Sequence, residues 1–441
     1  MSFPRYPSYK ASGVEWLGDV PGHWEASRLR YVCQCLDGQR IPLNASQRSD
    51  KLGDIPYWGA NSIVGYVDEA LFDEDLVLLG EDGAPFFEPS KPVAFFSQGK
   101  VWPNNHVHVL RPTVRGTGTF ITYVLNATDY AQFIDGSTRD KLTQGSMNDI
   151  PILWPPISEQ TQIAAFLDTE TAKIDELVAE QRRLMELLKE KRQAVISHAV
   201  TQGLNPHAPM KPSGIEWLED VPVHWEIGPV KRHIARVESG TSVNSSDEPA
   251  EDGKLGVLKT SCVYTGKFEP TENKTVVLED IDRVSCPLKA GTIIVSRMNT
   301  PELIGAAGFV DSAPSNLFLP DRLWQIFFST ADARFVHFWT LTSLYRAQVE
   351  SVCTGTSSSM KNLGQNQFGS FAIAMPPKNE QALIANFLAD ETAKFDTLTA
   401  EAQRAIDLLQ ERRTALISAA VTGQIDVRHI VRESNHAENH L

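Results

Sequence analysis

Two long amphipathic segments dominate the hydrophobic pattern of the chain. In both, apolar residues recur at alternating steps of three and four over about five heptads, with Glu, Lys and Arg between them. A double proline precedes each segment, and Gly203 and Gly423 follow them. The pattern predicts two uninterrupted helices of coiled-coil type, within 155–203 and 376–425, each about 60–65 Å long at the helical rise per residue.

Heptad positions a and d of the two helices form the predicted contact seam. Its apolar members are Leu167, Ile174, Leu177, Leu184 and Leu188 in the first helix and Leu388, Phe395, Leu398, Leu409 and Leu416 in the second. Position d also holds Glu170 and Lys191 in the first helix, and Glu391 and Arg412 in the second. An antiparallel pair would place these acidic side chains opposite the basic ones. Because each helix is the natural partner of its repeat, we expect the pair to form within one molecule; pairing between two copies is the alternative.

A shorter block repeats ahead of each variable segment. Residues 12–25, SGVEWLGDVPGHWE, return at 213–226 as SGIEWLEDVPVHWE, with eleven of fourteen positions identical. The helical segments repeat as well, whereas 26–154 and 227–375 show little similarity to each other. We call the repeated blocks and helices the frame, and the segments 26–154 and 227–375 the inserts. A duplication with a similar frame and dissimilar inserts indicates one architecture with two different specificities.

These repeats predict the organisation of the whole chain. It comprises an N-terminal frame block (1–25), a first variable domain (26–154), a central helix (155–203), a repeated frame block (204–226), a second variable domain (227–375), a C-terminal helix (376–425) and a polar tail (426–441). Trp16 and Trp24 recur as Trp217 and Trp225, and we expect them to anchor each insert to a helix end. Pseudo-twofold symmetry would then bring the N-terminal block close to the end of the C-terminal helix.

The inserts show short apolar runs of the kind that form strands. The predicted strands are 77–80, 93–96 and 107–110 in the first insert and 275–278, 291–295 and 324–328 in the second, with helices at 120–127 and 335–349. The expected fold class is mixed α/β (α+β), with two β-rich domains and two long helices in an antiparallel coiled coil.

Composition narrows the class of protein without deciding it. The net charge of −14 is unusual for a protein that coats nucleic acid, and on its own it favours a function without DNA. No stretch approaches the roughly 20 apolar residues that span a bilayer, and the N-terminus lacks the apolar core of a secretory signal. The five cysteines form no repeating framework, so we expect a cytoplasmic protein with reduced thiols.

Motifs for catalysis are missing from the sequence. There is no phosphate-binding GxxxxGK[ST] loop, and the prolines at 155–156 and 376–377 lack the amide and the aromatic residue of an amino-methyltransferase motif. His106 and His108 would share a strand face, but no third ligand is near in the sequence. We therefore expect no catalytic residue, no metal and no cofactor.

The repeated frame resembles that of a known family. The PP…EQ…IA…FL…ETAK…D helix, present twice, and the G(V/I)EWL…VP…HW block before each insert are similar to the specificity subunits of type I restriction–modification enzymes. The resemblance implies a non-catalytic subunit whose inserts each read one half of a split, asymmetric DNA site. It also implies that the helices set the distance between the half-sites and dock two methyltransferase subunits, and that restriction subunits join the assembled complex.

Candidate DNA contacts lie in polar, glycine-bearing loops of the inserts, because Arg, Lys, Asn and Gln read base edges and Ser, Thr and Lys hold phosphates. In the first insert the candidates are Tyr57, Trp58, Gly59, Asn61, Lys100, Asn104, Asn105, His106, Arg139 and Lys141. In the second they are Lys259, Thr260, Arg297, Asn299, Arg322, Gly355, Ser358 and Lys361. A coiled-coil scaffold that carries two protein- or glycan-binding domains is the alternative function.

Overall fold

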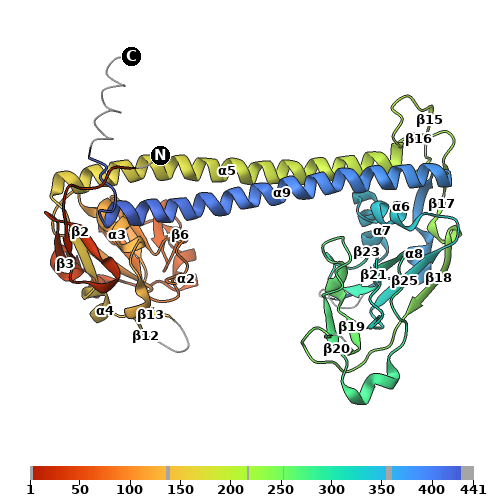
Figure 1. Ribbon diagram of the computed structural model, residues 1–441, viewed down its shortest axis with the longest axis horizontal. Helices are drawn as coiled ribbons and strands as arrows, with labels where there is room; N and C mark the ends of the chain where they lie inside the picture. The colour runs from red at the N-terminus through yellow and green to blue at the C-terminus, as the bar shows by residue number, and fades with distance from the viewer. Residues whose placement is uncertain (1–2, 136–139, 216–217, 252, 354–359, 429–441) are drawn as a thin grey trace. The chain divides into compact units, whose positions relative to one another are not determined.

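The computed structural model describes residues 3–135, 140–215, 218–251, 253–353 and 360–428. It divides into two compact units, of which unit 1 comprises Met1–Arg183 with Ala402–Leu441 and unit 2 comprises Leu184–Glu401. Two long helices, α5 (Ile157–Gln202) and α9 (Lys378–Val421), each contribute one portion to either unit (Figure 1). The expected mixed α/β class with two long helices is confirmed.

Unit 1 is built on two four-stranded sheets. The first has the order β4-β11-β8-β9 and consists of β4 (Cys33–Cys35), β11 (Val107–Pro112), β8 (Leu76–Gly80) and β9 (Ala94–Ser97), all antiparallel. The second has the order β6-β5-β10-β7 and consists of β6 (Ile63–Val67), β5 (Ile55–Trp58), β10 (Lys100–Pro103) and β7 (Phe72–Asp73), with β5 and β10 parallel. Smaller elements are β1 (Tyr9–Ala11), β2 (Asp19–Pro21), α1 (Leu29–Val32), α2 (Ala45–Ser49), α3 (Gly118–Asn126), β12 (Ile134–Asp135), β13 (Lys141–Leu142) and α4 (Gln144–Asn148).

Unit 2 repeats this plan. Its four-stranded antiparallel sheet has the order β18-β25-β21-β23 and consists of β18 (Ile234–Ser239), β25 (Leu323–Phe328), β21 (Thr292–Ser296) and β23 (Ala307–Val310). A three-stranded sheet joins β20 (Asn273–Thr275), β19 (Gly256–Leu258) and β24 (Leu317–Phe318), with β19 and β24 parallel. Smaller elements are β15 (Met210–Lys211), β16 (Val221–Pro222), β22 (Met298–Asn299), α6 (Ala333–Thr340), α7 (Ser343–Val352), β26 (Lys361–Asn362) and α8 (Gln365–Ser370).

The two inserts therefore share one topology despite their dissimilar sequences. In unit 1 the end of β8 pairs with β11 so that Gly80 lies opposite Val107. In unit 2 the end of β21 pairs with β25 so that Ser296 lies opposite Leu323. This common register assigns each residue at the end of the unit 1 sheet to a counterpart in unit 2.

Each insert closes on itself next to a long helix. In unit 1, β3 (Glu25–Arg28) pairs with β14 (Pro151–Trp154), and in unit 2, β17 (Glu226–Pro229) pairs with β27 (Ala372–Met375). The entry and exit of each insert thus lie side by side. A double proline, which cannot extend a strand ladder, then leads the chain from the exit strand into the helix.

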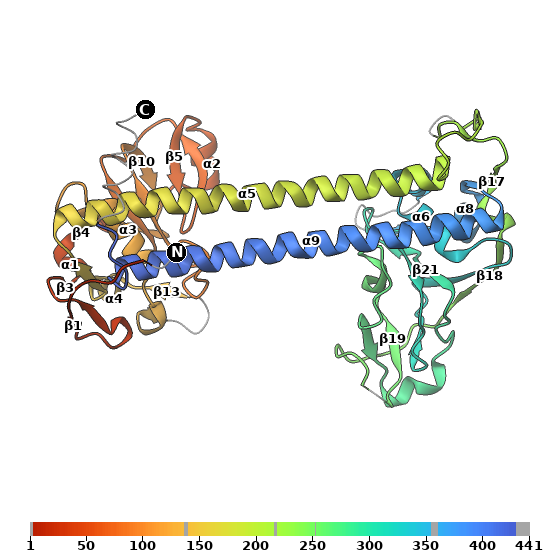
Figure 2. The same ribbon diagram turned by 45° about the horizontal axis from the view of Figure 1, so that its top comes forward.

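The long helices run antiparallel within each unit (Figure 2). In unit 1, Leu167 near the start of α5 shares a hydrophobic core with Leu416 near the end of α9, and Arg413 Nε lies 3.1 Å from Asp175 Oδ1. In unit 2, Ala199 near the end of α5 shares a core with Leu388 near the start of α9.

Part of the position d row of the predicted seam is wrong, since Ile163 and Ile384 of this row are fully buried but three leucines are not. Position a is buried or half-buried throughout, at Leu167, Ile174, Leu188, Leu388, Phe395, Leu409 and Leu416. The position d residues Leu177, Leu184 and Leu398 are instead 43%, 43% and 45% exposed. The second buried row lies four residues after position a, at Thr171, Val178, Ala199, Thr392, Ile406 and Ala420.

Buried threonines explain why the heptad pattern did not predict the second buried row. Thr171 and Thr392 are buried because each hydroxyl donates to a carbonyl oxygen of its own helix, at Leu167 and Leu388. Position d glutamates pair within their helices, Glu170 with Lys173 at 2.7 Å and Glu391 with Lys394 at 2.6 Å, rather than across the seam.

Candidate nucleic-acid interface

A buried glutamate in the first turn of α5 anchors the first insert. The Glu159 carboxylate accepts hydrogen bonds from Trp24 Nε1 at 3.1 Å and from the Tyr6 hydroxyl at 2.6 Å, and it lies 2.8 Å from His23 Nε2. Asp426 N also donates to Pro4 O at 2.8 Å, so the N-terminal segment lies against the end of α9, as the sequence predicts.

The same anchor recurs in unit 2. Glu380, in the first turn of α9, accepts from Trp225 Nε1 at 3.2 Å and lies 2.7 Å from His224 Nε2. Trp24 and Trp225 are both fully buried, so their predicted anchoring role agrees with their contacts. Trp16 is half-buried against the unit 1 core, and Trp217 lies outside the described residues.

In unit 1, several candidate residues meet where strands β5, β8 and β10 end and β11 begins. Gly59 N donates to Ser62 O at 2.8 Å and closes a turn that leaves Asn61 exposed. Asn104 N donates to Trp58 O at 3.0 Å, which holds the loop after β10 beside this turn. Asn105, the next residue of that loop, is exposed.

Charged side chains form a network at the same end of unit 1. His106 Nδ1 lies 2.6 Å from Asp82 Oδ1, and Lys141 Nζ lies 3.3 Å from Glu81 Oε1. Arg40 Nη1 donates to the other oxygen of Glu81 at 2.6 Å. Two candidates, His106 and Lys141, are thus paired with Asp82 and Glu81, which were not among the candidate DNA contacts.

Other candidates of unit 1 are structural. Tyr57 is only 2% exposed, and its hydroxyl bonds to the backbone of Leu43. Trp58 packs against Phe95 with ring centroids 4.8 Å apart, and Asn104 is buried with Oδ1 accepting from His106 N at 2.7 Å. A buried side chain that already has partners cannot read a base, so we withdraw Tyr57 and Asn104 as contacts.

Lys100 is separated from this loop cluster. Lys100 is exposed but begins β10, the strand whose other end carries the candidate loop, and it lies opposite Asp73. Arg139 lies outside the described residues.

In unit 2 the described candidates come together. The Thr260 hydroxyl lies 2.8 Å from the Tyr264 hydroxyl, which accepts from Asn299 Nδ2 at 2.8 Å. Asn299 also faces Lys361 across β22 and β26, and Arg297 N donates to Arg322 O at 3.0 Å.

Within this group the residues have different roles. Asn299 is buried and serves to position its neighbours, and Lys259 Nζ lies 3.9 Å from Glu272 Oε2. Arg322 is exposed and Lys361 half-exposed. Gly355 and Ser358 lie outside the described residues. Tyr264 was missed by sequence reasoning because nothing local distinguishes it from a core tyrosine.

One group in unit 1 has the composition of a metal site. The ligand atoms of Asp37, Glu81 and His108 all lie within 4.8 Å of one another. Each is engaged by the protein, however, since His108 Nδ1 lies 2.5 Å from Asp37 Oδ2 and Arg40 donates to Glu81. Burial alone would raise the pKa of Asp37, but the hydrogen bond and charge of His108 outweigh it and hold that pKa below its ordinary value. We interpret the group as an ion-pair network.

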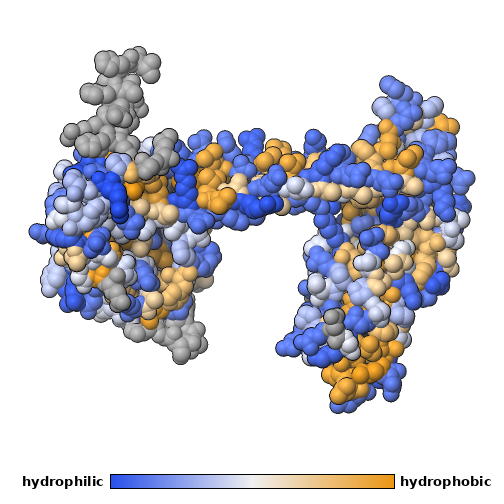
Figure 3. Space-filling view, viewed as in Figure 1, coloured by the Kyte–Doolittle hydropathy of each residue, from blue (hydrophilic) through white to orange (hydrophobic). Residues whose placement is uncertain are grey.

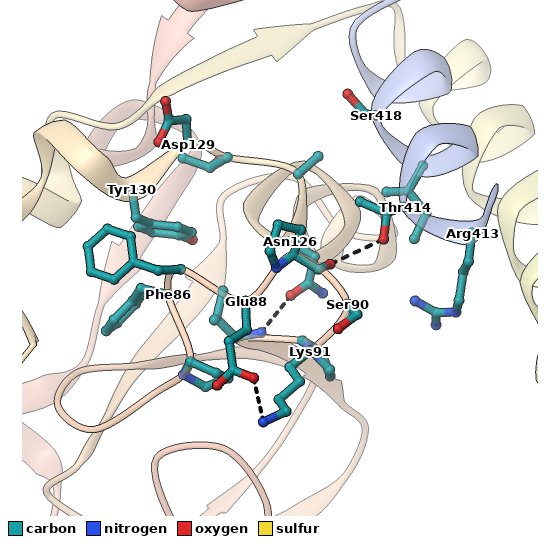
Figure 4. A pocket seen from close by; sticks show the side chains of 18 residues that line it. Phe86, Glu88, Ser90, Lys91, Asn126, Asp129, Tyr130, Arg413, Thr414 and Ser418 are labelled. Atoms are coloured by element: carbon teal, nitrogen blue, oxygen red, sulfur yellow. Dashed lines mark hydrogen bonds and ion pairs between the residues drawn. The ribbon is translucent and has the colours of Figure 1, made fainter. Parts of the chain in front are cut away.

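A further pocket of unit 1 lies between the insert and α9 and contains none of the candidates (Figure 4). Thr414 Oγ1 donates to Pro89 O at 3.3 Å, and Asn126 Oδ1 accepts from the backbone N–H of Val93 at 2.8 Å. The first contact joins the loop at 85–93 to α9 and the second joins it to α3. We therefore interpret the contacts around this pocket as structural, because they hold the insert in place.

Comparison with known proteins decides the family. The model of the type I restriction modification DNA specificity domain matches residues 21–185 and, a second time, 222–407. The chain belongs to this family. It is a type I restriction–modification specificity subunit with two DNA specificity domains, one for each insert and the adjoining part of a long helix.

Relatives of this specificity subunit match most of its length. A putative type I restriction enzyme specificity subunit of Haemophilus influenzae is 28% identical over 391 residues, which cover 88% of this chain and 89% of that protein. The EcoKI specificity subunit of Escherichia coli K12 is 25% identical over 338 residues, 72% of this chain and 68% of that one.

A solved structure has the same fold. A chain from a study of complex assembly and conformational transition of the type I R-M system aligns with a TM-score of 0.63 at 14% identity, covering 91% of this chain and 98% of its own. Among the residues that the structure describes, no helix is long and apolar enough to cross a bilayer.

Proposed function

We propose that this specificity subunit reads a bipartite, asymmetric DNA site, with each insert contacting one half. One observation carries the proposal: the two inserts share a strand order but place different side chains at the same loop ends. Two identical readers would suit a palindrome. Two different readers suit two unlike half-sites.

We propose that the same loop ends touch the DNA. In unit 1 the retained candidates are Gly59, Asn61, Asn105, His106 and Lys141. In unit 2 they are Thr260, Arg297, Arg322 and Lys361. Their support is their placement together at the strand ends. Asn61, Asn105, Lys141 and Arg322 are exposed, and His106, Thr260, Arg297 and Lys361 are partly exposed, whereas Gly59 is buried and would contribute only through the shape of its turn. In unit 2, Asn299 bonds to Tyr264 and helps to hold the group in place.

We further propose that the long helices set the spacing of the half-sites and dock two methyltransferase subunits, through which restriction subunits join the complex. Large apolar side chains remain on the surface of these helices (Figure 3). They include Leu177, Leu184 and Leu187 of α5 and Leu398 and Leu408 of α9. Exposed leucines at helical spacing on a paired helix suit burial against a partner protein.

An exchange of inserts tests whether each insert reads one half-site. Residues 26–154 are replaced by the corresponding insert of a relative, and the modified sequence motif is read by methylation sequencing of cells that also express the methyltransferase subunit. We expect one half-site to change and the other to stay, and a matched exchange of 227–375 should change only the other half. A change in both halves, or in neither, would contradict the proposal.

A paired deletion tests the spacing role. Removing one heptad from α5 and one from α9 shortens each helix by about 10 Å, which corresponds to about three base pairs of B-form DNA. We expect the gap between the half-sites to shorten while both half-sites stay the same. An unchanged gap would rule out the helices as the spacer.

The net charge of −14 favours a second candidate, a coiled-coil scaffold with two protein- or glycan-binding domains. A footprint on DNA carrying the motif distinguishes the two, since the scaffold would protect no DNA when mixed with its methyltransferase partner.

A further inference from the structure

Arg297 of unit 2 occupies the position that Glu81 holds in unit 1. Glu81 N donates to His106 O at 2.9 Å and Glu81 O accepts from Leu142 N at 2.7 Å. Arg297 repeats both bonds, to Arg322 O at 3.0 Å and from Leu363 N at 2.9 Å. Each follows the last residue of the central strand of its sheet, so one backbone position carries opposite charges in the two units.

The surroundings of the two side chains also differ. The Glu81 carboxylate is neutralised by Arg40 at 2.6 Å and Lys141 at 3.3 Å. The Arg297 guanidinium instead lies over the ring of Trp324, with Cζ 5.8 Å from the ring centroid. Among the described residues, no carboxylate forms an ion pair with Arg297 and no group accepts a hydrogen bond from its side chain.

Three residues in this part of unit 2 each have a buried polar atom without a hydrogen-bond partner. The atoms are Arg297 Nε, Trp324 Nε1 and Asn362 Oδ1 in the described part of the chain. The residues lie near one another, because the Arg297 guanidinium lies over the Trp324 ring and Met298, the next residue, pairs with Asn362 across β22 and β26. Buried polar groups are normally satisfied, so a cluster of unsatisfied ones indicates a site that a ligand completes.

The chemistry of the site selects its ligand. Arg297 has an exposed neighbour in Arg322, and Lys361 lies nearby on β26, so the local charge is positive. A guanidinium presents a planar fork of donors. In the major groove that fork matches the two acceptors of guanine, O6 and N7, whereas adenine and cytosine present an amino donor.

We propose that Arg297 reads a guanine in the half-site contacted by unit 2, and that unit 1 makes no such contact at its equivalent position. The inference rests on the proposed function and adds the base and the residue that reads it. Glu81 cannot replace Arg297, because a carboxylate accepts hydrogen bonds and would repel the acceptors of guanine.

The test uses the full chain assembled with its methyltransferase subunit and compares Arg297→Gln and Arg297→Lys with wild type. Binding to a library of duplexes carrying all single-base changes of the motif gives the preference at each position. We expect Arg297→Gln to lose the preference for guanine at one position of one half-site, with cognate affinity falling roughly ten- to hundredfold, the range of a lost bidentate contact. Arg297→Lys should keep a weaker preference for guanine, because an ammonium can also donate to O6 and N7. The other half-site should not change.

Arg236→Gln is the matched control. Arg236 also lies over a ring of the same sheet, with Cζ 3.6 Å from the Phe327 centroid, but Glu238 neutralises it at 2.7 Å. We expect its motif to equal that of wild type, and circular dichroism shows whether all three variants are folded.

Three outcomes would overturn the inference. An equal loss of affinity for every duplex would make Arg297 a phosphate contact. A split motif that persists in Arg297→Gln with an unchanged preference at every position would exclude Arg297 from base reading and leave the proposed function standing. If wild type itself showed no split motif, the proposed function would fail and this inference with it.

Discussion

The indole Nε1 of Trp24 donates to the carboxylate of Glu159 at 3.1 Å, and this bond joins the last part of the first frame block to the first turn of α5. The equivalent bond in unit 2, from Trp225 to Glu380, is 3.2 Å long. The frame residues that repeat in the sequence are thus the ones that hold each insert on its helix. Glu159 has an additional donor in Tyr6 and is almost fully buried, whereas the side chain of Glu380 is 28% exposed.

Trp24→Phe should destabilise unit 1 by about 1–3 kcal/mol, the usual cost of leaving a buried acceptor with one donor fewer. Trp225→Phe should cost less, because water reaches Glu380. Urea unfolding followed by circular dichroism measures both losses. No loss in either variant would show that the glutamates do not depend on these donors, and equal losses would contradict the expected effect of the exposure of Glu380.

Exposed leucines of α5 should matter for assembly and not for folding. The double variant Leu177→Ser with Leu184→Ser is expected to unfold at nearly the same urea concentration as wild type while it loses co-elution with the methyltransferase subunit. Ile174→Ala, at a buried seam position, is the matched control and should lower stability by about 2–5 kcal/mol. If the double variant still co-elutes normally, the docking surface lies elsewhere.

Acid should weaken unit 2 through His337. Burial lowers the pKa of this imidazole to about 4, and its Nε2 lies 2.8 Å from Gly266 O. The unfolded chain has an ordinary histidine pKa, so between about pH 6.5 and pH 4 it binds a proton that the folded chain does not bind. The free energy of unfolding therefore falls as the pH drops through this window.

A variant without the imidazole isolates this contribution. His337→Gln keeps an N–H donor but does not titrate, so its stability should fall less than that of wild type between pH 6.5 and pH 4. Parallel pH curves for the two proteins would show that His337 is not responsible.

The thiols should resist alkylation in the folded protein. Burial raises the pKa of Cys33 to about 12 and that of Cys35 and Cys286 to about 11. Because the thiolate is the nucleophile, we expect slow labelling by iodoacetamide at pH 8 and complete labelling in urea. Mass spectrometry identifies each labelled cysteine, and rapid labelling of Cys33 in the folded chain would contradict its burial.

The sequence predicts the frame well because repetition preserves information. Trp24 and Trp225 could be assigned to the helix ends from their place in the repeated block, and the burial of Leu167 and Leu388 followed from heptad spacing. The second row of the seam could not be predicted. Thr171 looks polar but satisfies its hydroxyl within the helix, whereas Leu177 looks apolar but remains exposed.

The inserts show the limit of sequence patterns more clearly. Tyr57 sits in a polar, glycine-bearing loop sequence, yet its side chain points into the core. The common strand order of the two inserts left no trace that comparison of 26–154 with 227–375 could detect. The strand order is set by pairing between residues far apart in the sequence, such as Gly80 and Val107. Backbone hydrogen bonds make these pairs, so many different side chains are compatible with them.

The closed base of each insert has a consequence for how new specificities arise. Strand β3 pairs with β14, and β17 with β27, immediately beside the repeated blocks. A genetic crossover within those blocks would transfer a whole insert together with both strands of its base, and the tryptophan that meets the helix glutamate would be supplied by either parent. The recombinant chain would receive an intact insert in a single step, and the insert would fold because both strands of its base are transferred together.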